Sequence, residues 1–216
     1  MAGVRVGVLI SGRGSNMQAL IDAARAPDYA AEIAFVASNE AGAPGLDRAA
    51  EAGIATEVVA HRAFADRGGF EAALTAVLEA AGVELVCLAG FMRVLSGGFV
   101  ARWRDRLINI HPSLLPAFPG LDTHARALAA GVRLHGCTVH FLRDEVDHGP
   151  IIGQAAVPVL PGDDPATLAA RVLAAEHRLY PACLGLVAGG RARIVDERVE
   201  IEGASAHGSL ILNPAT

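Results

Sequence analysis

Short apolar runs alternate with longer segments of helical period through the first half of the chain. Apolar runs bounded by turn residues are typical of buried strands, and apolar positions three and four residues apart are typical of helices that face a core. The runs predict strands over residues 4–10, 32–37, 56–60, 85–89 and 107–110, and the helical periods predict helices over residues 16–25, 45–52, 69–81 and 98–103. This alternation favours a parallel sheet covered by helices on both faces, with ligands at the carboxyl ends of its strands.

The pattern changes after residue 116. A helix is expected over residues 123–130, and two longer strands, 137–143 and 151–159, are expected to pair antiparallel around the loop between them. A long helix should follow from Pro165 to about residue 187, with Asp163 or Asp164 as its N-cap. We expect Pro181 to kink this helix or to end it early. Residues 193–201 indicate a closing hairpin that turns at Asp196-Glu197.

Together these elements predict one α/β domain over residues 1–216, with a doubly wound, mostly parallel sheet. Its amino-terminal half, residues 1–110, should be Rossmann-like and bind phosphate. The antiparallel addition should lie near the carboxyl end, within residues 111–216.

The composition narrows the classes of function. The net charge of −5 argues against general nucleic-acid binding, so specificity should come from a pocket. All 18 basic residues are arginine, which excludes Schiff-base, pyridoxal-phosphate and Walker-type lysines. Three cysteines, Cys87, Cys137 and Cys183, lie in apolar surroundings and are expected to be reduced core thiols. With no run of membrane-spanning length and an opening run too short for a secretory signal, we expect a soluble cytoplasmic protein without a membrane partner.

The turn after the first strand carries two glycines, in Ser11-Gly12-Arg13-Gly14-Ser15-Asn16. Such a turn exposes backbone N–H groups at the positive end of a helix dipole, where a phosphate is stabilised. Met17 stands where a dinucleotide fingerprint has its third glycine, so a phosphate monoester fits better than NAD or ATP. The alternative is that the glycines only permit a tight turn and that Ser15 or Asn16 only caps the helix.

A second polar feature ends the fifth strand, in the segment Asn109-Ile110-His111-Pro112. Residues i and i+2 of a strand share a face, so the amide and the imidazole should project together. A functional site and a strand end that caps a turn are both consistent with this pair.

The acidic loop 144–149 could bring an aspartate to this imidazole and favour its charged form, giving a positioned acid. Spacing alone favours a solvated acidic turn. Glu176 lies on a predicted helix, where an exposed charge is the default expectation.

The sequence contains little evidence for a metal site or for a nucleophilic serine. The chain has eight histidines, but His135 and His140 are five apart and should lie on opposite faces of a strand. No His-Glu-x-x-His or Cys-x-x-Cys is present, and Ser113 lies in no Gly-x-Ser-x-Gly elbow. We therefore expect no metal.

Taken together, residues 11–16, 88–95 and 109–116 and Asp147 resemble the phosphoribosylglycinamide formyltransferase family, folate-dependent enzymes of purine synthesis. The resemblance runs from the first strand to at least Pro181. The segment His-Pro-Ser-Leu-Leu-Pro is shared with the wider formyltransferase family, which includes methionyl-tRNA formyltransferase and formyltetrahydrofolate deformylase. That segment therefore identifies the chemistry more than the substrate.

The resemblance implies direct transfer of the formyl group from 10-formyltetrahydrofolate to the amine of 5'-phosphoribosylglycinamide, by a monomer or homodimer. It implies Asn109, His111 and Asp147 as the catalytic residues, with His111 as general acid and oxyanion donor. The implied substrate-binding residues are Gly14, Ser15, Asn16, Met17, Gln18 and Glu176. The implied folate-binding residues are Arg67, Met92, Arg93, Val94, Leu95, Asn109, Arg143, Asp144, Glu145, Val146 and Asp147.

Two alternatives and two departures accompany this resemblance. A deformylase would use the same three catalytic residues with water as acceptor, but that family usually carries an amino-terminal regulatory domain, for which the first strand leaves no room. A folate- or nucleotide-binding protein without activity would have no need of the three residues together. His148 stands where the family is expected to have glycine, and would be strained if its φ were positive; Asp122 stands where histidine is common.

Overall fold

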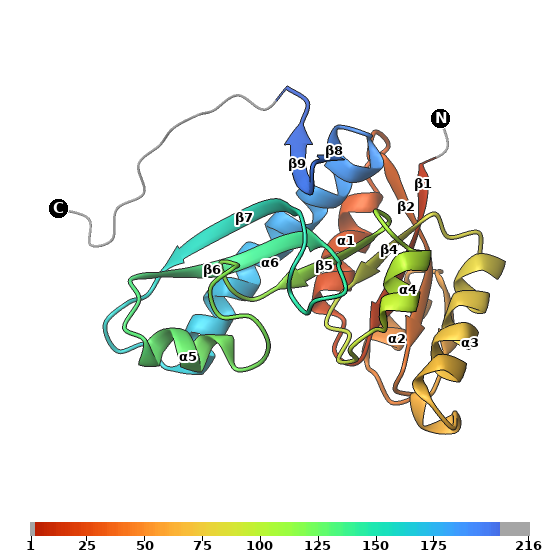
Figure 1. The fold of residues 1–216 in the computed structure, drawn as a ribbon, viewed down its shortest axis with the longest axis horizontal. Coiled ribbons are helices and arrows are strands. Elements are labelled where there is room, and N and C mark those ends of the chain that lie inside the picture. The colour runs from red at the N-terminus through yellow and green to blue at the C-terminus, as the bar shows by residue number, and fades with distance from the viewer. Residues whose placement is uncertain (1–2, 204–216) are drawn as a thin grey trace.

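A seven-stranded sheet forms the centre of the computed structural model, which describes residues 3–203 (Figure 1). Its strand order is β3-β2-β1-β4-β5-β6-β7. The pairs among β1 to β5 are parallel, whereas β6 pairs antiparallel with β5 and β7 pairs antiparallel with β6. The strands are β1 (Val4–Ile10), β2 (Ala31–Ser38), β3 (Ala55–Val58), β4 (Leu85–Leu88), β5 (Leu107–His111), β6 (Leu134–Phe141) and β7 (Ile151–Pro158). The predicted α/β class, the mostly parallel sheet and the antiparallel addition are confirmed.

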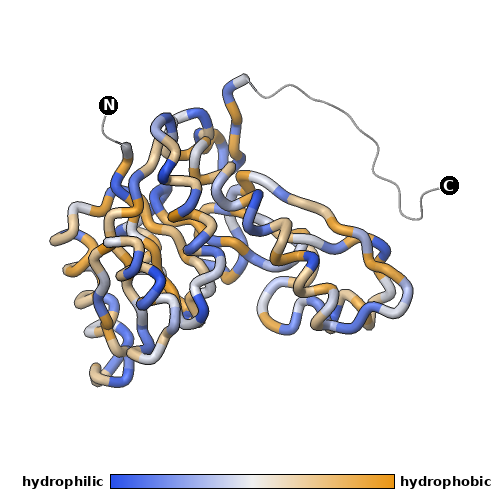
Figure 2. The backbone as a smooth tube through the Cα atoms, turned by 180° about the vertical axis from the view of Figure 1, so that it is seen from behind, coloured by the Kyte–Doolittle hydropathy of each residue, from blue (hydrophilic) through white to orange (hydrophobic). Residues whose placement is uncertain are grey.

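Helices cover both faces of this sheet, because alternate strand residues point to opposite faces and both sets are apolar. One core contains Val8 with residues of α1, α2 and α6, and the other contains Leu9 with residues of α3 and α4. Figure 2 shows the apolar stretches running through the interior of the amino-terminal half. The helices are α1 (Ser15–Ala24), α2 (Gly45–Glu51), α3 (Arg67–Ala80), α4 (Gly97–Arg102), α5 (Thr123–Ala129) and α6 (Pro165–Ala188), with a 3₁₀ turn η1 (His61–Ala63).

The long helix α6 differs from its prediction at Pro181. It begins as expected, with Asp164 accepting from the backbone N–H of Thr167 in a capping box and Pro165 in the first turn. It does not end at Pro181 and continues to Ala188. Tyr180 and Leu184 are fully buried on either side of the proline, so packing on both turns offsets the missing backbone N–H.

Two other elements bear on the site. β6 begins three residues earlier than expected, at Leu134, because Leu134 to Gly136 pair with Pro158 to Ala156 of β7. The predicted hairpin is present as β8 (Ala192–Val195) and β9 (Arg198–Ile201), a separate two-stranded sheet (Figure 1). Its turn uses positive φ at Asp196 and Glu197, 48° and 55°. Within residues 3–203, no helix combines the length and the apolarity that crossing a bilayer requires.

Candidate active site

The carboxyl ends of β1, β4 and β5 lie side by side, in a register that aligns Leu9 with Leu88 and Leu88 with Asn109. The loops that follow these strands therefore meet at one edge of the sheet. The strand order also reverses between β1 and β4, and such a switch point is where open α/β sheets bind ligands. The fold thus brings together the glycine turn, the loop after β4 and the polar end of β5.

The glycine turn leaves the start of α1 without a side-chain cap. Gly14 is the N-cap, with a left-handed φ of 70°, and no side chain bonds the first turn. The alternative in which Ser15 or Asn16 only caps the helix is therefore wrong. A Cβ on Gly14 would lie 2.8 Å from the Cα of Gly45, so glycine is needed here for close approach as well as for φ. The free N–H groups of this turn can receive an anion.

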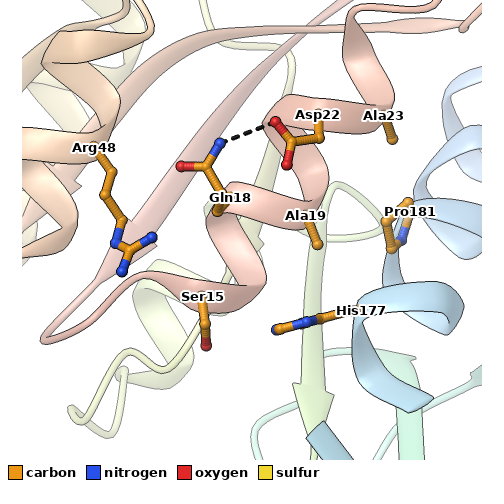
Figure 3. A pocket seen from close by; sticks show the side chains of 8 residues that line it. All are labelled: Ser15, Gln18, Ala19, Asp22, Ala23, Arg48, His177 and Pro181. Carbon is orange, nitrogen blue, oxygen red and sulfur yellow. Dashed lines mark hydrogen bonds between the residues drawn. The ribbon is translucent and has the colours of Figure 1, made fainter. Parts of the chain in front are cut away.

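A cavity of about 440 Å³ lies beside this turn, between α1 and α6 (Figure 3). Arg48 from α2 and His177 from α6 point toward Ser15 from opposite sides. The Nε2 atom of His177 is buried without a hydrogen-bond partner among the described residues, and burial lowers the pKa of this ring. Sequence reasoning named Ser15 and Gln18 but missed Arg48 and His177, which neither spacing nor motif singled out. The lining residues are Ser15, Gln18, Ala19, Asp22, Ala23, Arg48, His177 and Pro181.

Asn16 and Glu176 form a partly buried polar pair between α1 and α6. The amide of Asn16 donates to the Glu176 carboxylate at 2.7 Å, and Glu176 is only 6% exposed. Burial raises the pKa of Glu176, and the bond from Asn16 partly offsets this. The expectation of an exposed charge at position 176 is wrong. Met17, by contrast, has a fully buried side chain, so only its backbone could touch a ligand.

Asn109 is held by a histidine on the neighbouring strand. Its amide Nδ2 lies 3.4 Å from Nε2 of His140, with which it pairs in the β5–β6 ladder. The Nδ1 of His140 lies 3.1 Å from the carbonyl oxygen of Phe141, to which it donates when the ring carries its proton there. Burial lowers the pKa of His140 to about 4, so the ring is neutral and its Nε2 can accept from Asn109. His140 was considered only as a metal ligand from the sequence, and it instead fixes the orientation of the amide.

His111 faces an acceptor at each ring nitrogen. Its Nδ1 lies 3.3 Å from Oδ1 of Asp147, and its Nε2 lies 3.0 Å from the carbonyl oxygen of Phe118. The second oxygen of Asp147 accepts from the backbone N–H of Gly120 at 2.7 Å. A neutral imidazole has a single N–H, whereas the carboxylate and the carbonyl only accept, so the charged ring alone satisfies both contacts. The acidic loop therefore does reach the imidazole, and the solvated-turn alternative is wrong for Asp147.

Two further histidines pack behind this pair. The rings of His124 and His135 meet edge to face at 5.3 Å, and Phe118 packs on His135. Burial lowers the pKa of His135 to about 4 and also lowers that of His124. Among residues 3–203 no group of three or more histidine, cysteine or acidic side chains could hold a metal ion.

The expected folate surface is apolar and partly open. Met92, Val94 and Val146 are exposed, whereas the side chain of Leu95 is buried, so only its backbone could contribute. The backbone N–H of Met92 donates to Oγ of Ser11 at 2.8 Å, which ties this loop to the glycine turn. Arg67, Arg93, Asp144 and Glu145 are exposed.

The structure bears on two predictions about the acidic loop and its flanking residue Arg143. The guanidinium of Arg143 binds Glu197 and Asp105, so its charge is already used within the chain. The expected strain at His148 is absent, because the positive φ values of this loop belong to Asp147 and Gly149. Asp122 has a φ of 55° and caps α5 without a side-chain bond.

The chain matches known proteins over most of its length. Residues 4–184 match the family described as formyl transferase. The phosphoribosylglycinamide formyltransferase of Escherichia coli (strain K12) is 45% identical over 196 residues, which is 91% of this chain and 92% of that protein. The crystal structure of glycinamide ribonucleotide transformylase 1 from Symbiobacterium toebii has a TM-score of 0.90 at 50% identity, covering 92% of this chain and 94% of that one.

A longer relative matches only in part. The human trifunctional purine biosynthetic protein adenosine-3 is 53% identical over 190 residues, 88% of this chain. The chain spans 19% of that protein's length.

Proposed function

The chain belongs to the formyl transferase family, and we propose that it transfers the formyl group of 10-formyltetrahydrofolate to the amine of 5'-phosphoribosylglycinamide. The products are the formylglycinamide ribonucleotide and tetrahydrofolate, in a step of de novo purine biosynthesis (EC 2.1.2.2). The observation that carries this proposal is the contact of His111 with Asp147 beside Asn109, at the edge of the sheet where the glycine turn also lies. The similarity to proteins named for this reaction supports the choice of substrate.

The chemistry requires a stabilised oxyanion. When the amine attacks the formyl carbon, the carbonyl oxygen gains negative charge in a tetrahedral intermediate. Asn109 and the charged ring of His111 extend from the end of one strand and can donate to that oxygen. The Nε2–H of His111 would then turn from the Phe118 carbonyl to the formyl oxygen. Each such donor typically contributes a few kcal/mol to transition-state stabilisation.

The transfer needs no covalent enzyme intermediate. The amine nitrogen forms the new bond to the formyl carbon, and the bond between that carbon and N10 of the folate breaks. The proton released by the amine is delivered to N10, through His111 or bound water. Asp147 accepts from Nδ1 of His111 and so orients the ring for this transfer.

The substrate's two ends match two features of the structure. The uncapped start of α1, with Ser15 and Arg48 beside it, suits the phosphate. The amide oxygen of Asn16 is buried without a partner among the described residues, next to the Glu176 carboxylate. Two acceptors side by side suit the glycinamide amine.

The cosubstrate would lie against the loop after β4 and the loop 142–149 between β6 and β7, which includes the acidic segment 144–149. Exposed Met92, Val94 and Val146 can cover the faces of a pterin, and backbone groups can read its polar edge. Exposed Arg67 and Arg93 suit the carboxylates of the folate tail. The three cysteines are buried and free, in keeping with the cytoplasmic location that we propose.

One assay tests the proposal against its alternatives. Purified protein is incubated with 10-formyltetrahydrofolate, with and without the glycinamide ribonucleotide, and formylated product and tetrahydrofolate are both measured. We expect equal amounts of the two products, and only when the ribonucleotide is present. Release of tetrahydrofolate without the ribonucleotide would indicate a deformylase. Folate binding without either product would indicate a binding protein and would contradict the proposal.

A further inference from the structure

Arg143 lies at the centre of a network of charges next to the acidic loop. It follows the end of β6, and its Nε donates to Glu197 at 2.5 Å. One terminal nitrogen donates to Asp105 at 2.9 Å and the other to its neighbour's backbone, the carbonyl of Leu142, also at 2.9 Å. Arg104 donates to the other oxygen of Glu197 at 2.6 Å. Two arginines and two carboxylates are thus interleaved.

These charges come from three segments that are far apart in the sequence. Arg104 and Asp105 form the turn between α4 and β5, Arg143 begins the acidic loop, and Glu197 is at the turn of the β8–β9 hairpin. The Arg143 side chain is only 13% exposed, whereas those of Asp105 and Glu197 are 50% and 55% exposed, so solvent screens each ion pair from the carboxylate side. Burial opposes the charge, and yet Glu197 and Asp105 raise the pKa of Arg143.

The side chain of Arg143 also supports the loop directly. A Cβ on Gly149 would lie 3.2 Å from Cγ of Arg143 and 2.0 Å from the carbonyl oxygen of Phe141. The Cγ of Arg143 therefore lies close to Gly149 at the far end of the loop, where a larger residue would not fit. The backbone N–H of Phe141 donates to the carbonyl of Pro150 at 2.9 Å and closes the loop's base. Between these points lie Val146 and Asp147.

We propose that Glu197 is a positioning residue for the cosubstrate site: through Arg143, the β8–β9 hairpin holds loop 142–149 in the shape that receives the folate. This inference rests on the proposed function for the identity of the ligand. Its geometric part, that the hairpin orders the loop, does not depend on that function.

Through this network of charges, a substitution of Glu197 should alter the conformation of loop 142–149. Glutamine at position 197 keeps only one of the two side-chain oxygens that accept from Arg143 and Arg104, and its NH2 group cannot accept, so the two arginines can no longer both be paired there. A partly buried donor left unpaired destabilises its conformation, so the guanidinium should shift and release Gly149 above it. Asp105 would then be the remaining carboxylate partner of Arg143, beside the carbonyl of Leu142.

The test compares Glu197→Gln with Glu200→Gln. Glu200 lies on the same hairpin, is exposed and forms no ion pair among residues 3–203, so it controls for the loss of one negative charge. Hydrogen exchange of the amides of residues 142–149 and steady-state kinetics with both substrates are measured. In Glu197→Gln we expect exchange in the loop to rise about tenfold, and KM for the folate to rise about tenfold. KM for the ribonucleotide and the thermal unfolding midpoint should stay at the parental values, and Glu200→Gln should match the parent throughout.

Asp105→Asn tests the same arginine by removing the charge of its second carboxylate partner. Asparagine tolerates the positive φ of 59° at this position. In Asp105→Asn, too, we expect KM to rise for the folate and not for the ribonucleotide. Because both substitutions act through Arg143, the rise in KM in the double variant Asp105→Asn/Glu197→Gln should differ from the product of the two single rises.

The outcomes separate the two proposals. Loop exchange that is unchanged in Glu197→Gln, or a rise in KM that is equal for both substrates, would overturn the role of the hairpin. Absence of formyl transfer by the parental chain would instead overturn the proposed function, while the exchange measurement would still decide whether the hairpin orders the loop.

Discussion

Replacing Asp147 with asparagine should remove the carboxylate that faces Nδ1 of His111 while leaving the loop folded. Asparagine has the same shape, and its side-chain oxygen can still accept from the N–H of Gly120, as one carboxylate oxygen does at 2.7 Å. Its amide nitrogen then faces Nδ1 of His111, which must become an acceptor. The ring is therefore driven to its neutral form, with one N–H in place of two.

The size of the effect follows from the distance and the burial of the pair. The two side chains are 3.3 Å apart and only 7% and 11% exposed. Two unit charges at this distance attract by about 5 kcal/mol at an effective dielectric constant of about 20, which is an upper figure. The loss of one oxyanion donor typically costs about 2.7–4 kcal/mol in the transition state. We therefore expect kcat to fall by about 10²–10³, with KM for either substrate changed less than about threefold.

The assay follows formylated product with each substrate varied in turn, and thermal unfolding confirms that the variant is folded. Asp28→Asn serves as the control because Asp28 is exposed and lies outside the site. A folded Asp147→Asn protein with kcat within about threefold of the parental value would refute the reasoning, since His111 would then act without its counter-charge.

Two further substitutions and one pH dependence test other parts of the site. Arg48→Met should raise KM for the ribonucleotide about tenfold and leave KM for the folate unchanged, because one charged contact to the phosphate is lost; an unchanged KM for the ribonucleotide would remove Arg48 from the phosphate site. His140→Phe should lower kcat about tenfold, because the Asn109 amide loses the acceptor that orients it; a parental kcat would contradict this. Burial lowers the pKa of His140 from 6.5 to about 4, so the unfolded chain binds this proton at a higher pH than the folded chain does. The free energy of unfolding that the neutral ring contributes is therefore fully present above pH 6.5 and is lost as the pH falls toward 4. Guanidinium unfolding should show about 2 kcal/mol lost from this ring between pH 7 and pH 5, and His140→Phe should show a correspondingly smaller loss.

The main elements of the fold were predictable because they depend on local pattern. The run Val4–Ile10 was predicted to the residue, since both faces of a central parallel strand are buried from Val6 onward and Arg5 is the run's one charged residue. Asp164 and Pro165 mark the start of α6 through local hydrogen bonding and a fixed φ. An early end of α6 at Pro181 was wrong because the proline's penalty is local while the burial of Tyr180 and Leu184 that offsets it is tertiary.

The site was predictable only in part. Asn109 and His111 stand two residues apart, so their common origin at one strand end follows from strand geometry. The contact of His111 with Asp147 depends on how the β6–β7 loop folds back, and residue types alone favoured a solvated turn. Resemblance to a family supplied the partner that physical reasoning from the sequence could not.

Arg143 shows why position in a motif does not fix what a side chain does. Its place in the acidic loop implied a folate ligand, yet its partners Asp105 and Glu197 are 38 and 54 residues away in the sequence. A guanidinium that already binds two carboxylates has little net charge to offer a third, because the pairing that stabilises it also neutralises it. Under the proposed function, its contribution to folate binding should therefore pass through the shape of the loop rather than through its charge. Because of this, the residue that most directly tests the contribution is Glu197, which lies outside every motif that the sequence displayed.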